Sequence, residues 1–170
     1  MSEVVTEFGS MQDYRMGGVE VIDDDPKNYV FSNIFDVAVR SRPYERVVVA
    51  KNFEYVIEAA RAEGVSPWYT CAHDEFTVAM DGEVKVEFVK LDDPDAHVEP
   101  DSQGAHLIQG EPKGRKMGWV KLRRGHMALL PVGSAYRFTA EVPSCIILQS
   151  VDGPVTIHKW AEICQTKSLV

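Results

Sequence analysis

Apolar and polar residues alternate strictly between Glu83 and Phe88. Valine and phenylalanine side chains take one face and charged side chains take the other, which is typical of a half-buried antiparallel strand. The β-branched run Arg46–Ala50 predicts a strand before it. Later short apolar runs predict further strands at 119–122, 127–130, 136–140, 145–149 and 155–160. Because glycine-containing turns separate several of these runs, the pattern predicts an all-β, jelly-roll barrel.

One segment of the chain has a helical period. Asn52 is a suitable N-cap, and Gly64 is a suitable C-terminal glycine. The apolar residues spaced like one helical face are Phe53, Val56, Ile57 and Ala60. We therefore expect one short helix between Asn52 and Gly64. Residues 91–118 are rich in Asp, Pro, Gly and Lys, and they are expected to form a long loop.

Residues 1–45 show no clean period, and we expect them to form an extended N-terminal arm before a barrel domain at 46–170. The arm includes Gly17–Gly18, the acidic run Asp23–Asp25 and the apolar stretch Tyr29–Val39. So many aromatic and aliphatic side chains need a surface to pack on. That surface is either the chain's own barrel or a partner protein.

Composition limits the classes of function. With 170 residues the chain can form one domain with a real core. Its net charge of −8 argues against nucleic acid as a partner, because phosphates would be repelled. No apolar run approaches the roughly 20 residues of a membrane helix, and the acidic start is unlike a signal peptide. Three widely spaced cysteines fit reduced thiols, so we expect a cytoplasmic protein.

Two segments resemble the paired metal-binding motifs of the cupin family. Gly64–Gly82 has a proline before a short strand, then an Asp-Glu pair, an apolar strand and Asp-Gly. Gly125–Tyr136 has the glycine and the Pro-x-Gly turn of the second motif. In metal-binding cupins two histidines precede the glutamate of the first motif, and a histidine ends the second. Here the histidine positions of the first motif fall within Trp68–Cys71, and Tyr136 stands in place of the last histidine.

The residues of this vestigial cupin site are Trp68, Tyr69, Cys71, His73, Glu75 and Tyr136. A non-haem iron site commonly uses two histidines and a carboxylate. Only Glu75 matches, so we expect no metal ligand, no cofactor-binding residue and no catalytic residue in this chain. The three aromatic residues either stack on a phenolic ligand or simply fill the vacated cavity.

His73 has two interpretations. On a strand, His73 and Glu75 would face the same side, which would make His73 a shifted ligand. Otherwise it is a structural histidine bonded to a neighbouring carboxylate. His97 and His106 are expected to be solvated in the long loop, and Lys113–Lys116 is either a solvated loop tip or a site for an anionic partner.

Four further segments carry a closer resemblance. They are residues 29–36, 41–52, 63–69 and 72–76, and their sequences resemble the small subunit of two-subunit hydroquinone 1,2-dioxygenases. The resemblance implies a partner large cupin subunit that holds Fe(II), in a heterotetramer that degrades phenols such as 4-nitrophenol. It also implies a hydroquinone-type substrate, opened with O2 to 4-hydroxymuconic semialdehyde. A chain that keeps the cupin frame without its ligands fits the non-catalytic subunit.

A second hypothesis belongs to a different class. The chain would be a stand-alone metal-free cupin that binds or isomerises a small aromatic molecule. That protein would need an open apolar pocket near Trp68, Tyr69 and Tyr136.

Overall fold

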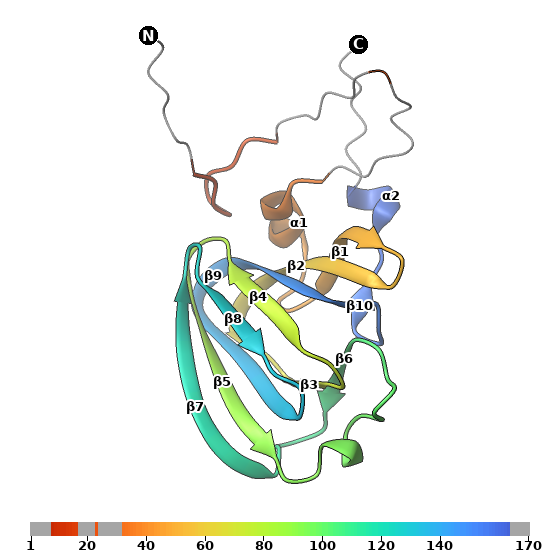
Figure 1. Ribbon diagram of the computed structural model, residues 1–170. Coiled ribbons are helices and arrows are strands. Elements are labelled where there is room, and N and C mark those ends of the chain that lie inside the picture. The colour runs from red at the N-terminus through yellow and green to blue at the C-terminus, as the bar shows by residue number, and fades with distance from the viewer. Residues whose placement is uncertain (1–7, 17–22, 24–31, 164–170) are drawn as a thin grey trace.

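The computed structural model describes residues 8–16, 23 and 32–163. The strands are β1 (Arg46–Asn52), β2 (Tyr55–Val65), β3 (Trp68–Cys71), β4 (Glu75–Ala79), β5 (Glu83–Leu91), β6 (Ala105–Ile108), β7 (Gly114–Arg123), β8 (Met127–Leu130), β9 (Ser134–Val151) and β10 (Thr156–Ile157). The helices are α1 (Ile34–Arg40), the 3-10 turn η2 (Pro94–Ala96) and α2 (Trp160–Ile163). Figure 1 shows the strands curling into a nearly closed barrel, with α1 and α2 at one end. The predicted all-β jelly-roll barrel is confirmed.

Strand β9 organises the barrel. It runs through 18 residues, where the sequence predicted two strands at 136–140 and 145–149. Its first half pairs with β5 and β3, and its second half pairs with β2 and β4. The register against β2 shifts where Ala62 pairs with Ser144 and Gly64 with Ala140. Pro143 lies in this irregularity, where its missing N–H costs no ladder bond.

The helix predicted between Asn52 and Gly64 is wrong, because this segment forms β2. Its apolar residues fit both periods, and pairing with β1 and β9 decides between them. Val56, Glu58 and Ala60 alternate into the interior, where each is almost fully buried. Phe53 lies in the β1–β2 turn at φ 55° and is 84% exposed, so it belongs to no buried face.

The short helix instead lies inside the predicted arm, as α1. The side chain of Asn33 caps it by accepting the N–H groups of Phe35 at 3.0 Å and Asp36 at 3.3 Å. Val37 packs on Val47 and Ala59 of the sheet. At seven residues the helix is too short to show a period, and burial against the sheet stabilises it.

The arm is described only in part. Gly17–Gly18, Asp24–Asp25 and the beginning of Tyr29–Val39 lie outside the described residues. Met11 is buried beside Ala38 and Cys145, and its N–H donates to Asp81 Oδ2 at 2.6 Å. The described part of the arm therefore packs on the chain's own barrel.

The long loop predicted at 91–118 is also wrong in part, since it contains η2, β6 and the first half of β7. Strand β7 pairs with β5 on one side, and all its residues but Leu122 are exposed. Edge strands of this kind carry many charged residues, so they look like loops in a sequence. The basic cluster Lys113–Lys116 lies where β7 begins.

The interior of the barrel contains the main apolar core. Its larger buried side chains are Tyr69, Val84, Val86, Leu122, Leu130, Tyr136, Phe138, Ile146 and Leu148. None of the helices among the described residues has the length and apolar character needed to cross a membrane.

Candidate functional site

Glu75 and Tyr136, at the two positions that match cupin metal ligands, meet inside the barrel. Glu75 begins β4 and is completely buried. Tyr136 lies near the beginning of β9 and is 1% exposed. The Tyr136 hydroxyl donates a hydrogen bond to Glu75 Oε2. The two motifs therefore converge on one point of the core, as their resemblance to cupins predicts.

The guanidinium of Arg46 lies between these two side chains. It donates from Nη2 to Glu75 Oε1 at 2.7 Å and from Nη1 to the Tyr136 hydroxyl at 3.1 Å. Its Nε donates to Glu58 Oε2 at 2.5 Å. Arg46, Glu58, Glu75 and Tyr136 are named the Arg46 cluster below. Thr156 completes it by donating to Glu58 Oε1 at 2.8 Å.

The two carboxylates of the Arg46 cluster have opposite pKa shifts. Burial raises the pKa of Glu58 above its ordinary range, and the charge of Arg46 only partly offsets that. Burial acts on Glu75 too, but the charge of Arg46 and hydrogen bonds to the carboxylate outweigh it, so its pKa is lowered. Burial raises the pKa of Tyr136 well above its usual value, with a further contribution from the Glu75 charge. Tyr136 is therefore a neutral donor, and Glu75 is an ionised acceptor.

The Arg46 cluster does not fit a metal ion. A divalent cation needs several anionic or neutral donor atoms with free lone pairs. Here the lone pairs of Glu75 and Tyr136 face a fixed positive charge, so a second cation would be repelled. Among the described residues, no group of three or more His, Cys, Asp or Glu side chains could hold a metal.

Tyr69 and Cys71 also point into the barrel. The ring of Tyr69 stacks on Tyr136 with centroids 5.6 Å apart, and the Arg46 guanidinium carbon lies 5.8 Å from the Tyr69 centroid. Cys71 donates from Sγ to the Gly104 carbonyl at 3.1 Å. Burial raises the pKa of the Cys71 thiol to about 12, so it is protonated at neutral pH and is a poor ligand.

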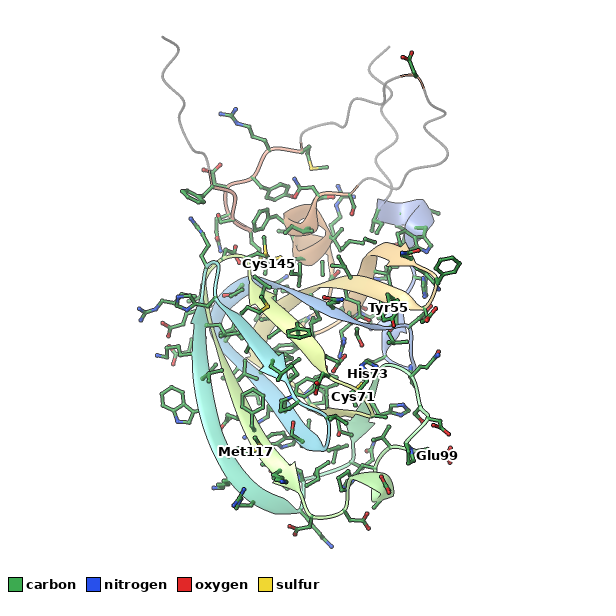
Figure 2. All side chains as sticks on the ribbon, in the orientation of Figure 1. Tyr55, Cys71, His73, Glu99, Met117 and Cys145 are labelled. Atoms are coloured by element: carbon green, nitrogen blue, oxygen red, sulfur yellow. The ribbon has the colours of Figure 1, made fainter. Side chains whose placement is uncertain are left out.

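Trp68 and His73 lie apart from this group. Trp68 packs on the other face of β3, with the Arg137 guanidinium carbon 4.3 Å from its ring centroid. His73 precedes β4 (Figure 2). Its Nε2 accepts the Gly104 N–H at 3.2 Å. His73 is therefore a structural histidine, although its partner is a backbone group and not the expected carboxylate. A shared site of His73 and Glu75 is not formed.

His106 differs from its prediction as well. It lies on β6 and not in a solvated loop, and its buried Nε2 has no hydrogen-bond partner among the described residues.

The sequence patterns did not point to Arg46 and Glu58 as members of a site. Interpreting 53–63 as a helix placed Glu58 on the solvent face. Arg46 looked like the polar beginning of an apolar strand. The available signal was the alternation of Arg46 with Val48, which puts a charge on the inward face of a buried strand.

The space beside the cluster is nearly filled. A cavity of about 10 Å³ lies between Tyr44, Arg46, Tyr69 and Phe138. That is about the volume needed for one water molecule, and it is far too small for an aromatic ring.

The hypothesis of a stand-alone cupin needs an open apolar pocket near Trp68, Tyr69 and Tyr136. Beside Tyr69 and Tyr136 the space is too small for one, whereas a pocket of about 320 Å³ lies on the other side of β3, where Trp68, Trp119 and Arg137 line it.

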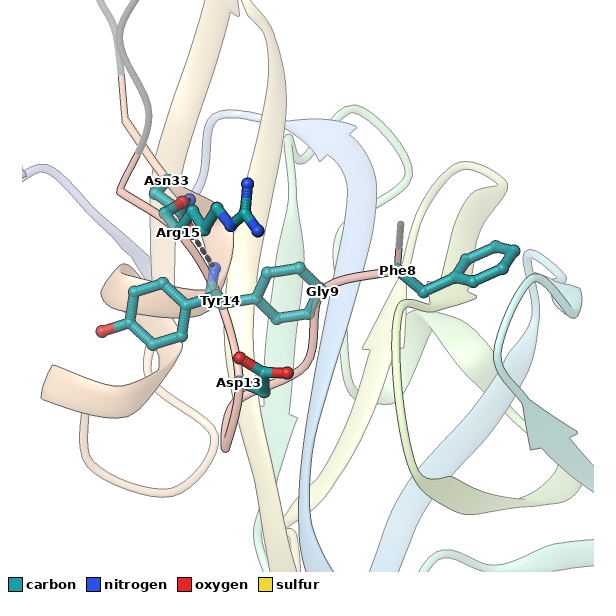
Figure 3. A pocket seen from close by; sticks show the side chains of 7 residues that line it. Phe8, Gly9, Asp13, Tyr14, Arg15 and Asn33 are labelled. Carbon is teal, nitrogen blue, oxygen red and sulfur yellow. Dashed lines mark hydrogen bonds between the residues drawn. The ribbon is translucent and has the colours of Figure 1, made fainter. Parts of the chain in front are cut away.

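A larger pocket of about 470 Å³ lies between the arm and α1 (Figure 3). Tyr14 donates to Asp36 Oδ1 at 3.0 Å and stacks on Phe35 with centroids 6.3 Å apart. Asn33 Nδ2 donates to the Arg15 carbonyl at 2.8 Å. These contacts attach the arm to α1, and the pocket shares no residue with the Arg46 cluster.

Solved structures similar to the whole chain place it in a family. A chain of hydroquinone 1,2-dioxygenase from Sphingomonas sp. TTNP3, with 4-hydroxybenzoate bound, is 64% identical with a TM-score of 0.92. The match covers 98% of this chain and 100% of that one. The chain belongs to the hydroquinone 1,2-dioxygenase family. A chain of hydroquinone 1,2-dioxygenase PnpCD, in complex with Cd²⁺ and 4-hydroxybenzonitrile, is 52% identical with a TM-score of 0.89, over 96% of this chain and 98% of that one.

The dioxygenase family also contains a longer chain. In the structure of PnpCD with Fe³⁺, a chain matches 82% of this chain at 11% identity and a TM-score of 0.60, and the match covers 38% of that longer chain. This likeness shows a common fold alone. The full-length matches are to the short chain, so the predicted membership among the small subunits is confirmed. Comparisons with protein-family models and with curated proteins give no match.

Proposed function

We propose that this chain is the metal-free accessory subunit of an Fe(II)-dependent hydroquinone 1,2-dioxygenase. The iron lies in a large cupin subunit, and the two chains form a heterotetramer in the cytoplasm. The enzyme opens the hydroquinone ring with O2 and yields 4-hydroxymuconic semialdehyde. Both oxygen atoms enter the product, so the reaction needs no external reductant.

The main support for this proposal is the position of the Arg46 guanidinium. Its guanidinium bonds to Glu75 and Tyr136, the two side chains at cupin ligand positions. An internal cation therefore provides the positive charge that those positions would otherwise take from a metal. The side chains of the cluster already form hydrogen bonds with one another in the buried core. They are therefore not free to act on a substrate, and we expect no catalysis in this barrel.

Features outside the cluster support the same proposal. The similar short chains come from hydroquinone 1,2-dioxygenases solved with 4-hydroxybenzoate and with 4-hydroxybenzonitrile, both of which are phenols. The buried free thiols of Cys71 and Cys145 are compatible with a reducing compartment. In such an enzyme the small subunit would hold active-site loops of the large subunit in place.

The test is reconstitution. This chain and the large subunit are expressed separately and together, and O2 consumption with hydroquinone is measured with and without added Fe(II). We expect activity only when both chains and iron are present, with iron in the large subunit after the chains are separated. The proposal fails if this chain alone binds one iron, or if the large subunit alone is fully active.

A further inference from the structure

The barrel has two outer faces of opposite character. On the face formed by β5, β7 and the first half of β9, outward residues form ion pairs across the strands. Glu83 bonds to Lys121 at 2.8 Å and to Arg123 at 2.9 Å, and Glu87 bonds to Arg137 at 3.2 Å. The face also exposes the ring of Trp119 opposite Glu87, and its paired charges are typical of a solvated antiparallel sheet.

The second face is formed by residues 55–59 of β2, the second half of β9, β4 and β8, and its described outward side chains carry no charge. The ion pair of Arg61 and Glu63 lies farther along β2, outside this face. Its larger outward apolar side chains are Ile57, Phe76, Val78, Met127, Leu129 and Ile147, and they are named the apolar face below. The register aligns Ile57, Gln149, Phe76 and Leu129 in one row across four strands. A second row aligns Ile147, Val78 and Met127. Gln149 is the one polar residue in these two rows.

The apolar face is uncovered by the described residues. Met127 is 60% exposed, Leu129 45%, and Phe76 and Ile57 40% each. Tyr55, which is 57% exposed, lies beside it and lines a depression of about 290 Å³ with Ile57 and Gln149. Soluble monomers rarely expose contiguous apolar patches of this kind. Lack of charge together with Phe, Tyr and Met is typical of an interface core.

We propose that the apolar face is the surface that binds the large cupin subunit. This inference rests on the proposed function, because it takes the large subunit as the partner. The longer PnpCD chain has the same fold, so it contains a comparable sheet that could pack face to face on this one.

A second copy of this chain is a poorer occupant of the apolar face. Two convex barrel faces touch over a limited area, whether the second barrel belongs to another copy or to the longer chain, and a stable interface buries roughly 800 Å² per partner. Two copies would also bring together chains of net charge −8. The match covers only 38% of the longer chain, so that chain has further segments that can extend the contact.

The test measures binding of the tagged large subunit to variants of the full chain. Phe76→Asp, Leu129→Asp and Met127→Asp each place a charge on the apolar face. We expect each to weaken binding at least tenfold, with a circular dichroism spectrum and unfolding temperature close to those of the unmodified chain. Met127 is the most exposed of the three residues, so Met127→Asp still tests the proposal if either of the other variants fails to fold.

Trp119→Asp and Val142→Asp are the matched controls. These residues are 60% and 62% exposed, and they lie on or beside the charged face. We expect both control variants to bind like the unmodified chain.

The possible results separate the two proposals. If the unmodified chain does not bind the large subunit, the proposed function fails. If it binds and the three variants bind equally well, the proposed function stands and the apolar face is not the interface. If the variants abolish only self-association in gel filtration, the occupant is a second copy and the inference is overturned.

Discussion

A guanidinium in a protein core is stable only when its charge and its donors are fully compensated. Arg46 meets this condition with Glu58, Glu75 and the Tyr136 hydroxyl, and its side chain is 3% exposed. The cluster links strands at the beginning, middle and end of the chain. We therefore expect its members to depend on one another energetically.

Arg46→Met tests this dependence. Removing the cation leaves two carboxylates buried without a charge partner, and we expect the free energy of unfolding to fall by about 3–5 kcal/mol. Urea unfolding measures the change. The triple variant Arg46→Met, Glu58→Leu, Glu75→Leu should regain more than half of the loss, because no buried charge remains. If the triple variant is no more stable than the single one, packing and not charge explains the loss.

Arg137→Met is the matched control for this experiment. Arg137 also contacts two carboxylates, on Glu87 and Glu111, but its side chain is 25% exposed. Water screens such pairs, so we expect a loss of about 1 kcal/mol or less.

The lowered pKa of Glu75 predicts a pH dependence. A carboxylate whose folded-state pKa lies below its ordinary value of 4.5 stabilises the fold above that value. The contribution is lost as the pH falls through the folded-state pKa. Glu75→Gln should therefore be less stable than the unmodified chain at pH 7, and the difference should narrow below about pH 4.5. Urea unfolding at several pH values measures both curves, and a difference that stays constant would contradict the prediction.

Glu58 and Glu83 are the carboxylates with which the pH dependence of Glu75 is compared. Glu58 has the opposite sign, because its pKa is raised, so its protonation favours the folded state as the pH falls. Glu83 is a solvent-exposed control whose pKa is lowered by hydrogen bonds from Lys121 and Arg123. Glu83→Gln should show a smaller dependence on pH, since solvent screens that interaction.

At the scale of elements, the Asp-Gly of the first motif has a structural role of its own. Asp81 is 2% exposed, and it accepts the N–H groups of Met11 and Cys145. Gly82 takes φ +63° in the turn between β4 and β5. The turn thus fastens the arm, β4 and β9 together, which is a structural task that needs no ligand.

Gly82→Ala should destabilise the protein by about 2–4 kcal/mol. The new Cβ would have the strain of a positive φ and would lie 2.8 Å from Ser144 Cβ. Gly110→Ala is the control, because Gly110 has φ +77° with no atom within 4 Å of an added Cβ. It should lose only the conformational part, about 1–2 kcal/mol. Equal losses in thermal unfolding would show that the Ser144 contact does not matter.

The strands β5, β2 and β7 differ in how clearly their sequences indicate a strand. Strand β5 alternates cleanly because one of its faces meets the core and the other meets water. Strand β2 could not be distinguished from a helix, because Ile57 and Ala59 on its outer face are apolar too. One belongs to the apolar face, and the other packs beneath α1. The first half of the edge strand β7, residues 114–118, lacked an apolar signal for the opposite reason, since its exposed residues are mostly charged or small.

At the scale of the whole molecule, the two outer faces predict how stability depends on a partner. A partner that binds only the folded chain stabilises it by RT ln(1 + [L]/Kd). With the large subunit in about hundredfold excess over Kd, this chain should gain about 2.7 kcal/mol, or about 5–10 °C in unfolding temperature. Thermal unfolding across a concentration series measures the shift. A tenfold weaker affinity leaves about 1.4 kcal/mol, so Met127→Asp should reduce the shift to about half or less, and Val142→Asp should preserve it.

The sequence by itself determined the barrel, the two cupin motifs and the loss of their histidines, because these depend on local alternation, turn residues and the identity of single positions. It also carried the family resemblance. Only the tertiary structure decided what stands at the point where the motifs converge. Arg46, Glu58, Glu75 and Tyr136 are far apart in the chain, and the pairing of β1, β2, β4 and β9 brings them together. A buried charge cluster is a property of that pairing, since no single strand shows where the partner of its charge will lie.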